Sequence, residues 1–104
     1  MSFLQQLFGS GQPSADLKNI INKGAFLVDV RTPGEFAAGS VPGAENIPLD
    51  TIPAQLTKFR DKENIVLFCR SGMRSGQAKG ILESNGFKNV VNAGTWEDVN
   101  RLLQ

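Results

Sequence analysis

The side chains that could do chemistry gather in one short stretch around the only cysteine of the chain, Cys69. Residues 65–68, just before it, form an apolar run without alternation, which predicts a strand buried on both faces. Residues 77–83 have the composition of a helix. In open α/β sheets, ligands bind at the carboxyl ends of the strands, and helix N-termini attract anions. These positions predict that Cys69 is a thiolate nucleophile within an anion-binding loop.

Such a loop has to lower the pKa of the thiol before the sulfur can act as a nucleophile. An ordinary cysteine, with a pKa near 8.5, is only about 3% ionised at pH 7. Lowering the pKa by about two units takes about 2.7 kcal/mol, whereas a helix N-terminus supplies about 0.3–1 kcal/mol. The remainder has to come from the arginines and from converging backbone amides, for which Gly72 and Gly76 provide the freedom. The candidate anion-binding residues are Arg70, Ser71, Gly72, Met73 and Arg74.

The composition excludes several other classes of protein. With 104 residues, 40% of them hydrophobic, the chain is long enough for one core but not for two. A net charge of +1 gives no indication of a nucleic-acid or membrane partner. One cysteine forms no intramolecular disulfide, and without histidine neither a zinc site nor a histidine-assisted hydrolase is expected. We recognise no membrane-spanning run and no signal peptide, so we expect a cytoplasmic protein.

The elements expected to position the loop alternate between strands and helices. Besides 65–68, segments typical of strands occur at residues 25–30, within 41–48, and at 90–92. Helices are expected over residues 14–22, 32–39, 50–59 and 77–83, with a last helix capped by residues 95–98. This alternation predicts an α/β domain over residues 14–104, with a central parallel sheet of four or five strands and helices on both faces. Residues 1–13 are predicted to form an N-terminal helical extension and a linker.

Two charged residues, Asp29 and Arg31, mark the end of the strand predicted at 25–30. They are expected at the same carboxyl edge of the sheet as Cys69. They could pair with each other and brace the loop, or they could bind substrate. We favour the supporting role over the binding role.

Four sequence motifs occur in a characteristic order along the chain. They are Asp29-Val30-Arg31 with Glu35-Phe36, the segment 39–48, the loop 69–75, and Ala93-Gly94-Thr95-Trp96. Together they make about residues 14–104 resemble the rhodanese family of single-domain sulfurtransferases. Two positions depart from the family pattern: Ser40 stands where histidine is common, and Ala93-Gly94 replaces a frequent Gly-Gly pair. The loop itself shows no departure.

The resemblance implies a small rhodanese-like α/β domain and a particular reaction. The thiolate of Cys69 would attack the outer sulfur of a small anionic donor such as thiosulfate, form a persulfide, and pass the sulfur to cyanide or a thiol. Arg74 and the loop amides would hold the anionic end of the donor. No metal or organic cofactor is implied, and a sulfur-relay protein is a further partner that fits. Because the chain has no second domain to cover the loop, we expect an open site.

Three alternatives remain beside this hypothesis. The first is a phosphatase or an arsenate reductase. On the fold that the resemblance implies, those enzymes have five residues between cysteine and arginine, whereas four separate Cys69 from Arg74, which counts against this alternative. A non-catalytic binding module is disfavoured because Cys69 is present. A persulfide carrier loaded by a partner protein shares the same chemistry, and the sequence does not separate it from the enzyme.

Overall fold

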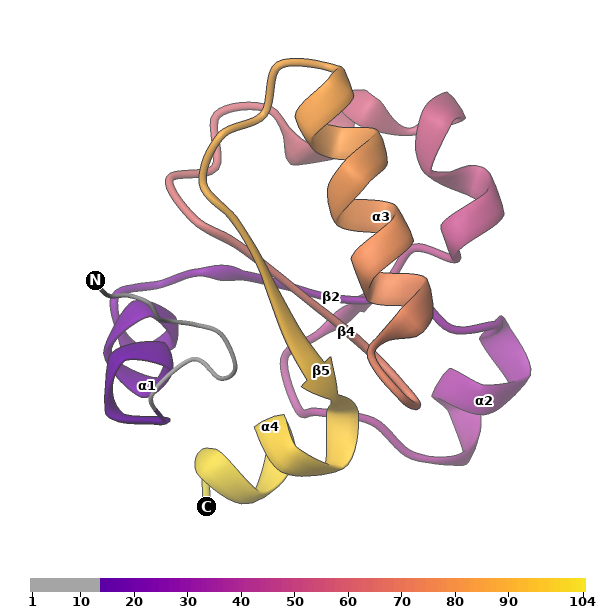
Figure 1. Cartoon of the computed structure of the whole chain (residues 1–104). Coiled ribbons are helices and arrows are strands. Elements are labelled where there is room, and N and C mark those ends of the chain that lie inside the picture. The colour runs from indigo at the N-terminus through magenta and orange to yellow at the C-terminus, as the bar shows by residue number, and fades with distance from the viewer. Residues whose placement is uncertain (1–13) are drawn as a thin grey trace.

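The computed structural model describes residues 14–104, in which helices cover both faces of a parallel sheet (Figure 1). The strands lie in the order β3-β2-β4-β5 and comprise β2 (Phe26–Asp29), β3 (Glu45–Asn46), β4 (Ile65–Cys69) and β5 (Val90–Thr95). All neighbouring strands are parallel, which confirms the predicted fold class. The predicted helical extension and linker, residues 1–13, lie outside the described residues, and the boundary at residue 14 stays a prediction. No helix within residues 14–104 is long and apolar enough to cross a membrane.

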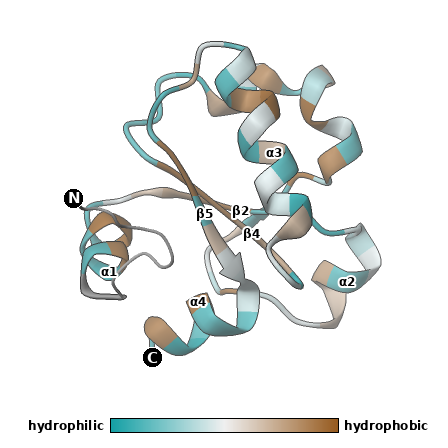
Figure 2. Cartoon of the chain, in the orientation of Figure 1, coloured by the Kyte–Doolittle hydropathy of each residue, from teal (hydrophilic) through white to brown (hydrophobic). Residues whose placement is uncertain are grey.

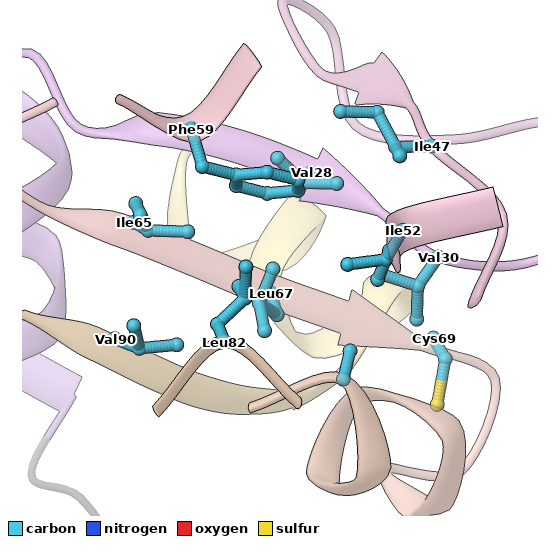
Figure 3. Packing of buried hydrophobic residues seen from close by; sticks show 11 residues of the cluster. Val28, Val30, Ile47, Ile52, Phe59, Ile65, Leu67, Cys69, Leu82 and Val90 are labelled. Atoms are coloured by element: carbon cyan, nitrogen blue, oxygen red, sulfur yellow. The ribbon is translucent and has the colours of Figure 1, made fainter. Parts of the chain in front are cut away.

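Strand β4 lies at the centre of the sheet, between β2 and β5, and all five of its residues are buried. Successive side chains of a strand point to opposite faces. Ile65, Leu67 and Cys69 belong to one buried cluster. Val66 and Phe68 belong to the cluster on the other face. Figure 3 shows Cys69 at the end of the strand, in line with Ile65 and Leu67. Because both faces are covered, the strand needs the unbroken apolar run from which it was predicted.

The helices divide between the two faces of the sheet (Figure 1). One face is covered by α3 (Met73–Ser84) and two 3-10 helices, η1 (Leu49–Ala54) and η2 (Leu56–Phe59), and the other by α1 (Ser14–Asn22) and α4 (Trp96–Leu102). Leu82 of α3 and Val99 of α4 are almost fully buried in these contacts. The short helix α2 (Pro33–Ala38) follows β2. In Figure 2 the hydrophobic colour lies along β4 and on parts of the helices that cover it.

The single helix predicted over residues 50–59 is wrong. The segment forms η1 and η2, which are separated at Gln55. Pro53 has no backbone N–H to donate within the first helix, and the Gln55 N–H donates to the carbonyl of Ile52, three residues back. Ile52 and Phe59 are nevertheless buried as the apolar pattern requires. Two further boundaries differ: α3 begins at Met73, earlier than predicted, and β5 continues beyond Asn92 to Thr95.

Candidate active site

Cys69 is the last residue of β4, and a short loop leads from it to the N-terminus of α3. Its Sγ accepts a hydrogen bond from the Gly72 N–H at 3.0 Å and lies 3.5 Å from the Oγ of Ser75. Cys69 is fully buried. The exposed residues of the loop and the first turn of α3 are Arg70, Ser71 and Met73. The loop is therefore exposed, whereas the sulfur is covered by Gly72 and Ser75, and the open site expected from the sequence stays a prediction.

A buried cysteine is often no more than a small hydrophobic residue, and Cys69 does belong to a core cluster. The polar contacts of its sulfur distinguish it from that case. A sulfur packed only among hydrocarbon side chains has no N–H group directed at it, whereas Gly72 donates to Cys69 at 3.0 Å. The side chain therefore lies at the boundary between the core and a polar loop.

Gly72 has the backbone conformation predicted for the loop. Its φ of +94° lies in the left-handed region, which favours glycine. A Cβ at this position would also lie 3.4 Å from the Cα of Gly94 on β5. The left-handed turn that directs the Gly72 N–H at the sulfur therefore favours glycine, and a side chain here would in addition contact β5.

Gly76 has a different role from the predicted one. It lies within α3 and has no left-handed φ, so it does not help the loop to curl. A Cβ at this position would instead lie 3.3 Å from the Nδ2 of Asn92. Gly76 therefore provides room for the side chain of Asn92.

Ser75 and Asn92 were not among the predicted site residues, yet both belong to the site. Ser75 is fully buried and donates a hydrogen bond from Oγ to the Oδ1 of Asn92 at 2.7 Å. The Nδ2 of Asn92 donates to the carbonyl of Gly72 at 3.1 Å. The only sequence signal for Ser75 was its place next to Arg74 on the expected helix, and Asn92 carried no signal because its strand is distant in sequence.

Opposing influences act on the pKa of the Cys69 thiol. Burial is the largest and raises the pKa, because a charged sulfur is poorly solvated there. The Ser75 hydroxyl lowers it, as do the backbone N–H groups of Ser75, Ser71 and Gly72. These hydrogen bonds together outweigh burial, so the pKa of Cys69 lies below its ordinary value.

Arg74 forms a bidentate ion pair with Glu35 of α2. Its Nη1 donates to Oε1 at 2.7 Å and its Nη2 to Oε2 at 3.0 Å. The Arg74 guanidinium, with help from the Thr32 N–H, lowers the pKa of Glu35 from 4.5 to about 2. The same hydrogen bonds raise the pKa of Arg74. An anion in the loop would therefore meet an ion pair at this position rather than a lone arginine.

Glu35 is held in place by its own helix terminus. The Thr32 N–H donates to the Oε1 of Glu35 at 3.0 Å, and the Glu35 N–H donates to the Oγ1 of Thr32 at 3.3 Å. This is the capping box predicted from the sequence. The contact of Glu35 with Arg74 was not predicted, because the two residues are 39 positions apart.

Asp29 and Arg31 form a buried pair at the end of β2. Arg31 donates to Asp29 from Nε at 2.9 Å and from Nη2 at 2.7 Å. Ser40 donates to Asp29 at 2.6 Å, and the Arg31 guanidinium carbon lies 5.0 Å from the ring centre of Trp96. Arg31 is 4% exposed and Asp29 is fully buried, a geometry that favours the supporting role over contact with substrate. Ser40, the departure from the family pattern, thus donates to the buried carboxylate.

Chemically, the arrangement combines a thiol of lowered pKa, a backbone N–H directed at the sulfur, and a helix that begins beside it. Such a site can carry a nucleophilic thiolate and stabilise negative charge on a sulfur bonded to it. The exposed Arg70 forms no ion pair with any other residue between 14 and 104.

Comparisons with known proteins agree with this geometry. Residues 14–100 match the model of the rhodanese-like domain. A sulfurtransferase of Allochromatium vinosum is 37% identical over 81 residues, which cover 78% of this chain and 71% of that protein. The thiosulfate sulfurtransferase PspE of Escherichia coli is 40% identical over 74 residues, covering 69% of this chain and 71% of that protein.

Among solved structures, the human single-domain sulfurtransferase TSTD1 superposes with a TM-score of 0.69 and 30% identity, covering 84% of this chain and 91% of that one. Proteins with other names are also similar. A tRNA uridine(34) hydroxylase of Buchnera aphidicola is 33% identical over 89 residues, covering 79% of this chain but 28% of that protein. The family model, the relatives and the fold agree, and the chain belongs to the rhodanese-like domain family.

Proposed function

We propose that this protein is a sulfurtransferase that carries a sulfane sulfur on Cys69. The observation that supports it best is the Cys69 sulfur at the end of β4, with the Gly72 N–H donating to it at 3.0 Å. Hydrogen bonds of this kind stabilise an anionic sulfur, whether it belongs to a thiolate or to a persulfide.

The proposed reaction has two displacements at sulfur. The Cys69 thiolate attacks the outer sulfur of thiosulfate, a new S–S bond forms, and the S–S bond of thiosulfate breaks. Sulfite leaves with the electron pair of the broken bond, and Cys69 becomes a persulfide. An acceptor, cyanide or a thiolate, then attacks the outer sulfur of the persulfide and releases the Cys69 thiolate.

The loop offers two kinds of contact for an anionic donor. Backbone N–H groups at the N-terminus of α3 suit the negative oxygens, and Arg70 supplies an exposed positive charge. Arg74 would act together with Glu35, because both of its terminal nitrogens already donate to that carboxylate. We therefore assign the first contact with the donor to Arg70 and the amides, and the shaping of the loop rim to the Arg74–Glu35 pair.

The names of relatives support this proposal at the level of the donor. PspE, 40% identical over 74 residues, is a thiosulfate sulfurtransferase. We carry thiosulfate over to this chain as the donor to test first.

A persulfide carrier loaded by a partner protein is the second candidate. The observation that favours it is Met73, an apolar side chain that is 75% exposed next to the loop. Flexible methionine side chains are common at protein-binding surfaces. A carrier would not take sulfur from thiosulfate by itself, but its thiol would still react with a more reactive sulfur donor such as inorganic polysulfide.

The intact mass of the protein after incubation with thiosulfate tests the proposal. We expect a gain of one sulfur atom, about 32 Da, that cyanide removes and that the variant Cys69→Ser does not show. Unfolding curves and a thiol titration establish that both proteins are folded and that Cys69 is reduced. A gain with inorganic polysulfide but not with thiosulfate would favour the carrier, and no gain with either would contradict both candidates.

A further inference from the structure

The side chain of Asn92 connects three parts of the site. Its Oδ1 accepts hydrogen bonds from the Ser75 Oγ at 2.7 Å and from the Gly94 N–H at 3.0 Å, while its Nδ2 donates to the Gly72 carbonyl at 3.1 Å. These partners determine which way the amide points, because an N–H must face the oxygen and a carbonyl must face the NH2 group. The Oδ1 of Asn92 is therefore an acceptor held next to Ser75.

The hydroxyl of Ser75 has one hydrogen and two acceptors within reach. One is the Oδ1 of Asn92 at 2.7 Å, and the other is the Sγ of Cys69 at 3.5 Å. An amide oxygen accepts and never donates, so the hydrogen between Ser75 and Asn92 belongs to Ser75. While it is used there, the remaining bond between Ser75 and Cys69 requires the thiol to donate to the Ser75 oxygen.

Ionisation of Cys69 changes this arrangement. When the thiol loses its proton, the sulfur can only accept hydrogen bonds. Asn92 and the thiolate then compete for the single hydrogen of Ser75. A hydrogen bond to a charged acceptor is about twice as strong as one between neutral groups, so the thiolate is the stronger competitor.

We propose that Asn92 is a positioning residue that acts through Ser75: it holds the Ser75 hydroxyl hydrogen away from the sulfur while Cys69 is a thiol and releases it to the sulfur when Cys69 becomes a thiolate. The change needs only a rotation of the Ser75 hydroxyl about one bond and no further reactant. It deepens the proposed function, since it concerns the thiol that would carry the sulfur. Its test measures the ionisation of that thiol and not sulfur transfer, so the two proposals can fail separately.

Charged groups also stand on the elements around the site. They are Arg74 on α3 with its partner Glu35, the buried pair Asp29 and Arg31 at the end of β2, and Arg70 in the loop. None of them forms a hydrogen bond with Asn92 or Ser75 in the described structure. Any effect of these charges on the pKa of Cys69 is therefore the same in variants at positions 75 and 92. Differences in that pKa among the variants report on the Asn92–Ser75 contact.

The experiment follows the ultraviolet absorbance of the Cys69 thiolate against pH, in the wild type, Asn92→Ala, Ser75→Ala and the double variant; the chain has no other cysteine and no tyrosine that would titrate in this signal. The midpoint of the profile is the pKa of the thiol. Asn92→Ala removes the competing acceptor, so we expect the midpoint to fall by about 0.5–1 pH unit. Ser75→Ala removes the donor, so we expect a rise of about one unit or more. In the Ser75→Ala background, replacing Asn92 should change nothing further.

The variant Asn92→Asp supplies a second test if Asn92→Ala does not fold. The carboxylate is a stronger acceptor and adds charge, so the midpoint should rise, and the rise should be smaller when Ser75 is absent. Asn85→Ala, at the far end of α3, is the matched control and should leave the profile unchanged. The proposal is overturned if Asn92→Ala leaves the midpoint unchanged or raises it, or if either substitution at position 92 has the same effect with and without Ser75.

Discussion

Several side chains of the candidate site also take part in the packing or capping of the fold. The side chain of Cys69 packs in a core cluster, yet its sulfur accepts an N–H from the loop. Glu35 closes the capping box of α2 with one set of contacts and holds Arg74 with another. Each of these residues therefore contributes polar atoms to the site and also stabilises its own element. A substitution affects both roles unless the new side chain preserves one of the two sets of contacts.

Glu35→Gln separates these two roles, because glutamine can keep the capping box but loses the charge. The pKa of Glu35 is about 2 in the folded protein, compared with 4.5 for the free group. The carboxylate therefore stabilises the fold fully above pH 4.5, and this contribution disappears as the pH falls toward 2. We expect the wild type to be more stable than Glu35→Gln at pH 6, with a difference that narrows in acid, as measured by denaturant unfolding. Glu63→Gln, at an exposed glutamate, is the control, and a difference independent of pH would contradict the ion-pair explanation.

At the scale of elements, the close packing of α3 against β5 builds the site. Two glycines make the approach possible: Gly72 passes the Cα of Gly94, and Gly76 leaves room for Asn92. Gly72 precedes α3 as its N-cap, and the helix itself contains one glycine besides Gly76, namely Gly80, with nothing within 4 Å of its hypothetical Cβ. Glycine inside a helix destabilises the helix relative to alanine. Gly76 therefore lowers the stability of α3, while it leaves space for the side chain of Asn92.

Replacing these two helical glycines by alanine tests this account. Gly80→Ala should stabilise the protein by about 0.5–1 kcal/mol, because only the helix preference changes. Gly76→Ala should stabilise it less, or destabilise it, because the new Cβ lies 3.3 Å from the Nδ2 of Asn92. Denaturant unfolding of both variants measures the difference. An equal gain from the two substitutions would mean that Asn92 moves aside without cost.

At the scale of the whole molecule, the buried carboxylate of Asp29 joins segments that are far apart in the chain. It receives hydrogen bonds from Arg31 and Ser40, and Arg31 in turn donates to the carbonyl of Gly39 and lies over the ring of Trp96 on α4. These contacts hold together the carboxyl edge of the sheet, where Cys69 also lies. We therefore expect the Asp29–Arg31 ion pair to stabilise this edge of the sheet rather than to bind a donor.

Asp29→Asn tests that role. Breaking a buried ion pair leaves an unpaired charge and typically costs about 3–5 kcal/mol, a large part of the about 5–15 kcal/mol by which a domain is stable. Ser40→Ala removes only one hydrogen bond and should cost about 1 kcal/mol. Denaturant unfolding measures both, and thiosulfate kinetics of the folded fraction should be unchanged. Full stability of Asp29→Asn together with a raised KM for thiosulfate would assign Asp29 to donor binding instead.

The buried strand, the helix starts and the position of Cys69 could be predicted from the sequence, because each depends on residues that are neighbours in the chain. An unbroken apolar run predicts a strand buried on both faces, and β4 is such a strand. The capping box at Thr32 and the cap at Thr95 predict where α2 and α4 begin, and both caps are present. The position of Cys69 between a buried strand and a helix follows from the same neighbours in the chain. The helix predicted over 50–59 was wrong: Pro53, expected in its first turn, lies inside the 3-10 helix η1, which ends before Gln55.

The tertiary structure decided which side chains surround the sulfur. Arg74 meets Glu35 across 39 positions, and Ser75 meets Asn92 across 17. Such contacts depend on which strands become neighbours in the sheet and how closely α3 packs on β5, so no local pattern contains them. The burial of the Cys69 sulfur has the same origin, because the loop and α3 lie against it only once the chain is folded. The position of Cys69 at the end of a buried strand therefore follows from the sequence, whereas the hydrogen bonds that lower the pKa of its thiol exist only in the folded chain.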